Sequence, residues 1–70
     1  MKTIVATFTG HNGSCGYETN KEYALTIYHY NDVKNKKIVV EKSGKNGEGY
    51  CEYDSIISFF NNWNKIKVLD

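Results

Sequence analysis

The stretch Lys21–Asn31, which reads KEYALTIYHYN, decides the fold class because its side chains alternate between two sets along nearly its whole length. Successive side chains of an extended strand point to opposite faces of the sheet. The pattern therefore predicts a β-strand with one face toward the core and the other toward solvent. The predicted core face is Tyr23, Leu25, Ile27 and His29, and the opposite face is Ala24, Thr26, Tyr28 and Tyr30.

Four further segments have the composition of short strands. Thr3–Thr9 (TIVATFT) is rich in β-branched residues and alternates, with Ile4, Ala6 and Phe8 on one side. The other three are Lys36–Ser43 (KKIVVEKS), Tyr50–Asp54 (YCEYD) and Lys65–Leu69 (KIKVL). Polar or glycine-bearing turns separate the first four strands, at 10–16 (GHNGSCG), 31–35 (NDVKN) and 44–49 (GKNGEG).

A helical turn is predicted between the fourth and fifth strands. Ile56, Phe59, Phe60 and Trp63 stand at positions i, i+3, i+4 and i+7, which is the spacing of one helical face. Asp54 or Ser55 is placed to act as the N-cap. Because a helix of about two turns is marginal by itself in water, we expect all four apolar side chains to be buried on the sheet.

Five short strands favour a small barrel, because closing the sheet removes its open edges. The long first loop and the helical turn just before the last strand favour an SH3-like arrangement over an OB-fold. We therefore expect one mainly β domain over residues 1–70, a five-stranded SH3-like barrel with a helical turn at about 55–63. Its core would be built around Leu25, Ile27, Ile38, Phe60 and Trp63.

Size and charge narrow the range of functions. A chain of 70 residues has little room for a catalytic cleft beside its core, which favours a protein that is not an enzyme. The net charge is +1 and every basic residue is lysine, so a duplex-DNA reader that depends on arginine is disfavoured. The sequence contains no apolar run long enough to predict a membrane span, and we expect a cytoplasmic protein.

The two cysteines, Cys15 and Cys51, leave three alternatives. We favour free thiols, because small secreted domains usually carry several disulfides and an export signal. A single disulfide is the second alternative. A zinc site would need His11 and His29 as well, and the spacing fits no usual zinc motif. We therefore expect neither a metal nor a cofactor.

The loop GHNGSCGY, residues 10–17, contains the residue types of a nucleophilic site, but their arrangement does not favour one. His11 is a weak base for Ser14 or Cys15 because no nearby carboxylate precedes Glu18 to orient its imidazole. The glycine spacing matches no phosphate-binding motif, although successive N–H groups could form a small anion nest. We interpret the loop mainly as a turn between two strands.

The segments FTGHNGSCGYETNKEYALTI and CEYDSIISFFNNW resemble a group of small SH3-like proteins encoded by bacteriophages and prophages of Gram-positive bacteria. The resemblance implies a phage-type accessory protein that acts in the bacterial host cytoplasm. It implies no catalytic residues, because the group shares a scaffold and is mostly of unassigned function.

The number of aromatic residues points to recognition as the function, because tyrosine provides a large contact area at modest entropic cost. We expect a non-enzymatic protein, a monomer or homodimer, that binds a host protein or a small nucleotide-like signalling molecule and inhibits a bacterial defence. An alternative is a single-stranded nucleic-acid binder that stacks bases on Tyr28 and Tyr30 beside the lysines at 34–45. A hydrolase using Cys15 or Ser14 ranks last. The candidate binding residues are Tyr17, Tyr28, Tyr30, His11, Asn12 and Ser14.

Overall fold

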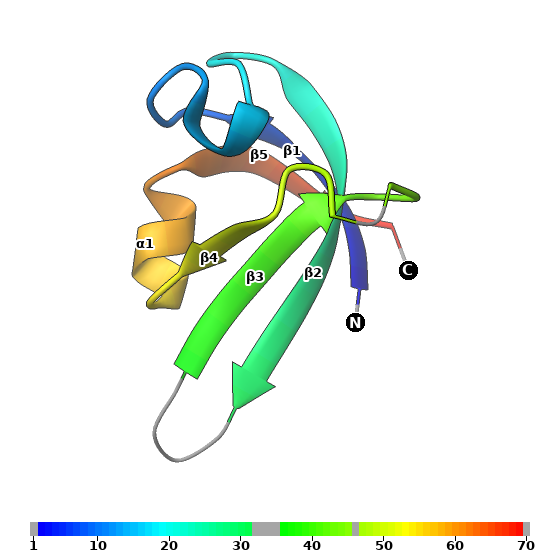
Figure 1. Cartoon of the computed structure of the whole chain (residues 1–70), viewed down its shortest axis with the longest axis vertical. Helices are drawn as coiled ribbons and strands as arrows, with labels where there is room; N and C mark the ends of the chain where they lie inside the picture. The colour runs from blue at the N-terminus through cyan, green and yellow to red at the C-terminus, as the bar shows by residue number, and fades with distance from the viewer. Residues whose placement is uncertain (1, 32–35, 46, 70) are drawn as a thin grey trace.

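The computed structural model describes residues 2–31, 36–45 and 47–69, except for the side chains of residues 29–31 and 36. These residues form strands, one short helix and one 3-10 turn (Figure 1). Most of the turn expected at 31–35 lies outside the described residues. In chain order the elements are β1 (Lys2–Phe8), η1 (Ser14–Gly16), β2 (Glu22–Asn31), β3 (Lys36–Lys42), β4 (Cys51–Tyr53), α1 (Ile56–Phe60) and β5 (Trp63–Val68).

The strands form one antiparallel sheet in the order β4-β3-β2-β1-β5. β1 lies between β2 and β5, so that Ile4 is opposite Leu25 on one side and Val68 on the other. Each strand except the two outer ones therefore has both neighbours within the chain. The mainly β class predicted from the sequence is confirmed.

The expected closure of the sheet into a barrel is wrong. The described strands form an open sheet, in which β4 and β5 are the two edges and do not pair with each other. β4 has only 3 residues, and α1 follows it and contacts β3, β4 and β5. The helix therefore lies where a β4–β5 ladder would have closed the sheet (Figure 1). The backbone bonds of a helix run along its own axis, so α1 covers the sheet without extending the ladder.

The core lies on one face of the sheet and follows the alternation of the sequence. Leu25 is buried on β2, and Ile38 and Val40 are buried on β3. Trp63 is at the centre, where its Nε1–H donates to the Tyr53 hydroxyl at 2.9 Å. Because a buried N–H without a partner is costly, this bond allows the indole to be fully enclosed. The other core residues are Ile4, Ala6, Phe8, Tyr17 and Phe59, with Tyr23, Ile27, Cys51 and Ile66 partly buried against them.

The helix is shorter than predicted and buries fewer of its side chains. Its N-cap is Ser55, whose Oγ accepts from the Ser58 N–H at 3.1 Å. The helix ends at Phe60. The Thr9 N–H donates to the Asn62 carbonyl at 2.7 Å, and this bond positions the following residue, Trp63, to begin β5 and pair with β1.

The expectation that Ile56, Phe59, Phe60 and Trp63 all pack on the sheet is therefore wrong for two of them. Phe59 and Trp63 are buried, whereas Ile56 and Phe60 are 48% and 55% exposed. A helix of 5 residues touches the sheet with little more than one side chain. Among the described residues no helix has the length and apolar character needed to cross a bilayer.

Candidate functional site

The first loop, residues 9–21, joins β1 to β2, as the sequence predicts. It turns back on itself through backbone bonds, in which Ser14 N–H donates to the His11 carbonyl at 3.0 Å and Gly13 N–H donates to the Tyr17 carbonyl at 2.7 Å. Gly13 has a φ of +89°, a conformation that a residue without a Cβ adopts without steric cost. The glycines of this loop therefore have a structural reason.

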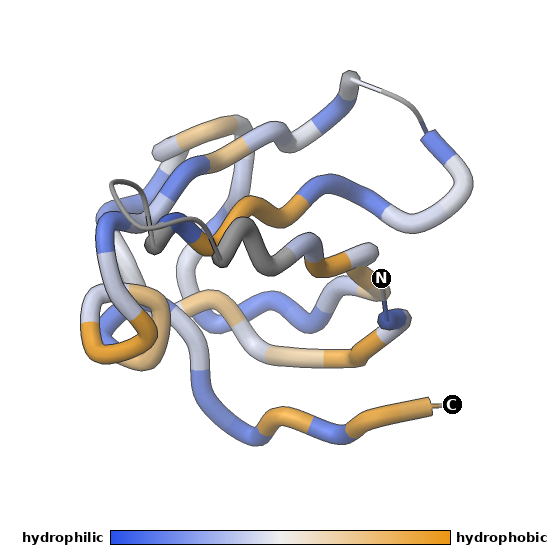
Figure 2. Tube along the Cα trace, turned by 90° about the horizontal axis from the view of Figure 1, so that it is seen from below, coloured by the Kyte–Doolittle hydropathy of each residue, from blue (hydrophilic) through white to orange (hydrophobic). Residues whose placement is uncertain are grey.

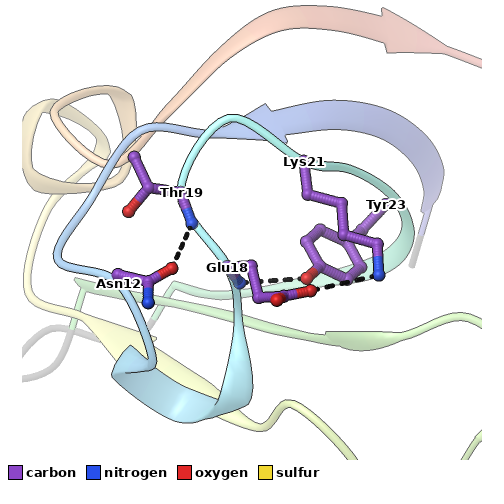
Figure 3. Close-up of polar contacts among 5 residues, drawn as sticks. All are labelled: Asn12, Glu18, Thr19, Lys21 and Tyr23. Atoms are coloured by element: carbon purple, nitrogen blue, oxygen red, sulfur yellow. Dashed lines mark hydrogen bonds and ion pairs between the residues drawn. The ribbon is translucent and has the colours of Figure 1, made fainter.

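Side-chain bonds hold the second half of the loop in place (Figure 3). Asn12 Oδ1 accepts from the Thr19 N–H at 3.0 Å, and the Tyr23 hydroxyl accepts from the Glu18 N–H at 2.9 Å. Lys21 Nζ lies 3.2 Å from Glu18 Oε2, and this contact raises the pKa of the lysine. Asn12, a predicted binding residue, thus uses its carbonyl oxygen to hold the loop.

His11, Ser14 and Cys15 are exposed at the tip of the loop. His11 and Ser14 therefore remain accessible to a partner. Cys15 is disulfide-bonded, so in this state it offers no thiolate for nucleophilic attack. Within the described ranges, no three histidine, cysteine, aspartate or glutamate side chains are grouped so that they could hold a metal ion.

The expectation that Tyr17 is a surface contact residue is wrong. Its side chain is fully buried, with ring centroids 5.5 Å from Phe8 and 4.8 Å from Trp63. Its hydroxyl donates to the Gly49 carbonyl at 2.7 Å, and burial raises the pKa of the phenol. The loop returns over the open end of the core, so the first aromatic residue after the glycines enters the core instead of facing solvent.

The two cysteines are paired, which corrects the expectation of free thiols. Cys15 in η1 is bonded to Cys51 at the start of β4, with their Cα atoms 5.8 Å apart. The bond between Tyr17 and Gly49 brings residues 15–17 against residues 49–51, and this proximity makes the disulfide geometrically feasible. A contact 36 residues apart in sequence could not be recognised from spacing alone.

Tyr28 is half-buried on the face of the sheet opposite the core. Its hydroxyl donates to Glu41 Oε1 at 2.9 Å, and Glu41 Oε2 accepts from the Gly47 N–H at 3.1 Å. Tyr28 therefore helps to hold the β3–β4 turn through Glu41. The side chain of Tyr30, the other aromatic residue predicted for this face, lies outside the described part of the chain.

An exposed apolar surface lies on α1, and it was not identified as a site from the sequence. Ile56, Ile57 and Phe60 are 48%, 69% and 55% exposed. They are separated by one, three and four positions, so they form one contiguous surface on the helix, which we call the α1 apolar face. Figure 2 shows the apolar colour of this helix at one side of the molecule.

The first loop borders the C-terminal end of α1. The Thr9–Asn62 backbone bond joins the two segments, and a Cβ on Gly10 would collide with the side chain of Asn62. Asn62 Nδ2 donates to the Ser58 carbonyl at 2.8 Å, which fixes this amide across the end of the helix. The α1 apolar face and the polar loop around His11 therefore belong to neighbouring segments.

The sequence contained a sign of this surface. Four of the five residues of α1 are large and apolar, and a single helical face accommodates only about half of its positions. At least one of Ile56, Ile57, Phe59 and Phe60 therefore had to remain in water. Which side would be left uncovered depends on how the helix lies on the sheet.

No protein-family model, curated protein or solved structure matches this chain.

Proposed function

We propose that this chain is a non-enzymatic binding protein whose contact surface is the α1 apolar face together with the neighbouring tip of the first loop. The observation that carries the proposal is the exposure of Ile56, Ile57 and Phe60 on a helix of 5 residues. A contiguous apolar surface on a small protein is costly to leave in water and commonly marks an interaction site. His11 and Ser14 are exposed polar residues of the loop that borders the C-terminal end of α1.

The partner that we propose is a bacterial host protein, with a small signalling molecule as the second choice, and the role is inhibition of a host defence. This part rests on the resemblance to phage-encoded SH3-like proteins. Three features support an SH3-like scaffold: the strand order β4-β3-β2-β1-β5, the long connection after β1, and the helix just before β5. An apolar helix face suits a protein partner better than a nucleotide, because it has no group to hold a phosphate.

The alternative of single-stranded nucleic-acid binding has less support. Tyr28 would have to stack a base while its hydroxyl is bonded to Glu41, a carboxylate that would repel the neighbouring phosphates. Stacking of a base on Tyr28 is therefore disfavoured.

The proposed location, a bacterial cytoplasm, is in tension with the Cys15–Cys51 disulfide. Cytosolic reductants keep most thiols reduced, and stable disulfides are typical of oxidising compartments. Trapping the thiols with an alkylating agent at cell lysis, followed by mass measurement, tests the location. A fully oxidised protein would contradict the cytoplasmic proposal.

Affinity capture from a bacterial lysate tests the binding function. Ile57→Asp places a charge on the α1 apolar face and changes no buried contact, so we expect it to abolish recovery of a specific partner. Lys45→Asp is the matched control, because it introduces the same carboxylate at an exposed side chain, 66%, in the turn between β3 and β4. If neither a protein nor a nucleotide is recovered, or if both variants recover the same partner as the unaltered protein, the proposal fails.

A further inference from the structure

The outer edge of β5 is open for pairing along the side that faces away from β1, which we call the β5 edge. The sheet order places β5 at one margin, where β1 is its only neighbour among the described strands. Figure 2 shows the C-terminal strand running along the outside of the molecule with no segment beyond it. β4, the other edge, has 3 residues, whereas β5 has 6. β5 is therefore the longer accessible edge.

The register fixes which backbone groups point outward. In an antiparallel ladder, residues alternate between pairs that bond to each other and pairs whose N–H and C=O groups point away. Leu69 N–H donates to the Thr3 carbonyl at 3.0 Å, so the next pair, Ile4 and Val68, is one whose groups point away. The Val68 N–H and C=O therefore face the β5 edge, and within the described chain they have no backbone partner.

The same argument applies at the other end of the strand. Thr9 N–H bonds to the Asn62 carbonyl, so Trp63, opposite Phe8, also directs its backbone groups outward. Between these ends the register shifts at Lys65, whose φ is +51°. The β5 edge thus has outward groups on both sides of a bulge.

The side chains along this edge have a distinct pattern. Lys65 and Lys67 are exposed, and neither forms an ion pair with any part of the chain that the structure describes. Val68 and Leu69 follow them at 58% and 59% exposure. Two cations without an ion pair among the described residues, next to an apolar end, favour a segment in which acidic and apolar residues alternate.

A second copy of this chain is disfavoured on the edge in the registers that bring lysines together. Antiparallel pairing of two β5 strands about Ile66 would place Lys65 of one copy opposite Lys67 of the other. Like charges directly opposite each other destabilise a strand pair, and lysines on an edge commonly prevent pairing between identical strands. The occupant should therefore be acidic where β5 is basic.

We propose that the β5 edge binds an extended acidic segment of a partner protein as an added strand. Backbone bonds to the outward groups of Val68 provide attachment, and acidic side chains beside Lys67 together with apolar side chains beside Val68 provide selectivity. This surface is separate from the α1 apolar face, so either proposal can fail without the other.

The probe for this proposal is an acetylated and amidated peptide of four Glu-Val repeats, titrated into the 15N-labelled protein and followed by amide chemical shifts. The expected result is a set of shifts centred on β5, with slower hydrogen exchange of the Val68 amide. Lys67→Glu should weaken binding roughly tenfold and should create binding to a peptide of four Lys-Val repeats. Lys45→Glu, the same charge change on an exposed lysine elsewhere, should leave both affinities unchanged.

A second variant tests the backbone contacts. Val68→Pro removes an outward N–H and no bond to β1, so the amide spectrum should remain that of the folded protein while peptide binding is lost. Three results would overturn the proposal: no shifts in β5 at millimolar peptide, shifts that Lys67→Glu leaves unchanged, or β5 shifts that appear on concentration of the protein alone, which would mean pairing between copies.

Discussion

Reduction of the Cys15–Cys51 disulfide should remove a large part of the stability of this protein. The bond closes a segment of 36 residues, and the chain-entropy relation gives about 13 cal/mol/K, or about 4 kcal/mol at 25 °C, for a loop of this length. A domain of 70 residues is typically stable by about 4 to 10 kcal/mol. The reduced protein should therefore be close to its unfolding threshold.

The measurement is thermal and urea unfolding of the same protein with and without a phosphine reductant. With an unfolding entropy of roughly 150 cal/mol/K for this length, a loss of 4 kcal/mol corresponds to a Tm lower by about 25 °C. The Cys15→Ser/Cys51→Ser variant is the control, because the reductant should not change its Tm. It should unfold near the temperature of the reduced protein.

Two results would refute this reasoning. If the reduced protein, with two thiols verified by alkylation and mass, keeps its Tm to within about 5 °C, the disulfide does not constrain the unfolded chain as the relation assumes. If the protein purified without reductant has two free thiols and is fully stable, the pairing of Cys15 with Cys51 is wrong.

Three further predictions follow from the core. Gly49→Ala should destabilise the protein by about 3 kcal/mol, because the residue has a positive φ and a new Cβ would collide with the Tyr17 hydroxyl. Gly44→Ala should destabilise it by about 1 kcal/mol, because Gly44 has a positive φ but open space around it. Equal losses of stability in urea unfolding would contradict this prediction. Phe59→Ala should lower the free energy of unfolding by about 3 to 5 kcal/mol and Phe60→Ala by less than about 1 kcal/mol, since only the ring of Phe59 is buried. A larger loss for Phe60→Ala in the same urea curves would contradict this. Burial raises the pKa of Tyr17 above its ordinary value of 10.0, so the unfolded chain releases the phenol proton first and stability should fall as pH rises above about 10. In an ultraviolet titration this phenol should stay un-ionised until the chain unfolds. Its ionisation in the folded protein would contradict the prediction.

The candidate site could be predicted less well than the strands. His11 and Ser14 were predicted as binding residues of the first loop, and both are exposed. Tyr17 was wrongly predicted to lie at the surface, and its burial could not be foreseen because its bond to Gly49 joins segments that are far apart in the chain. Ile57 was not recognised at all. Its 69% exposure follows from the way α1 is placed between β4 and β5.

The sequence by itself determined the approximate positions of the strands and the core face of β2, because a side-chain period of two depends only on local backbone geometry. Leu25 and Ile38 were predicted to be core residues, and both are buried. Only the tertiary structure decided that the sheet stays open, that the cysteines pair, and that Phe60 faces water while Tyr17 does not. Each of these depends on contacts between distant segments, and residue spacing along the chain does not encode the distance between such segments in space.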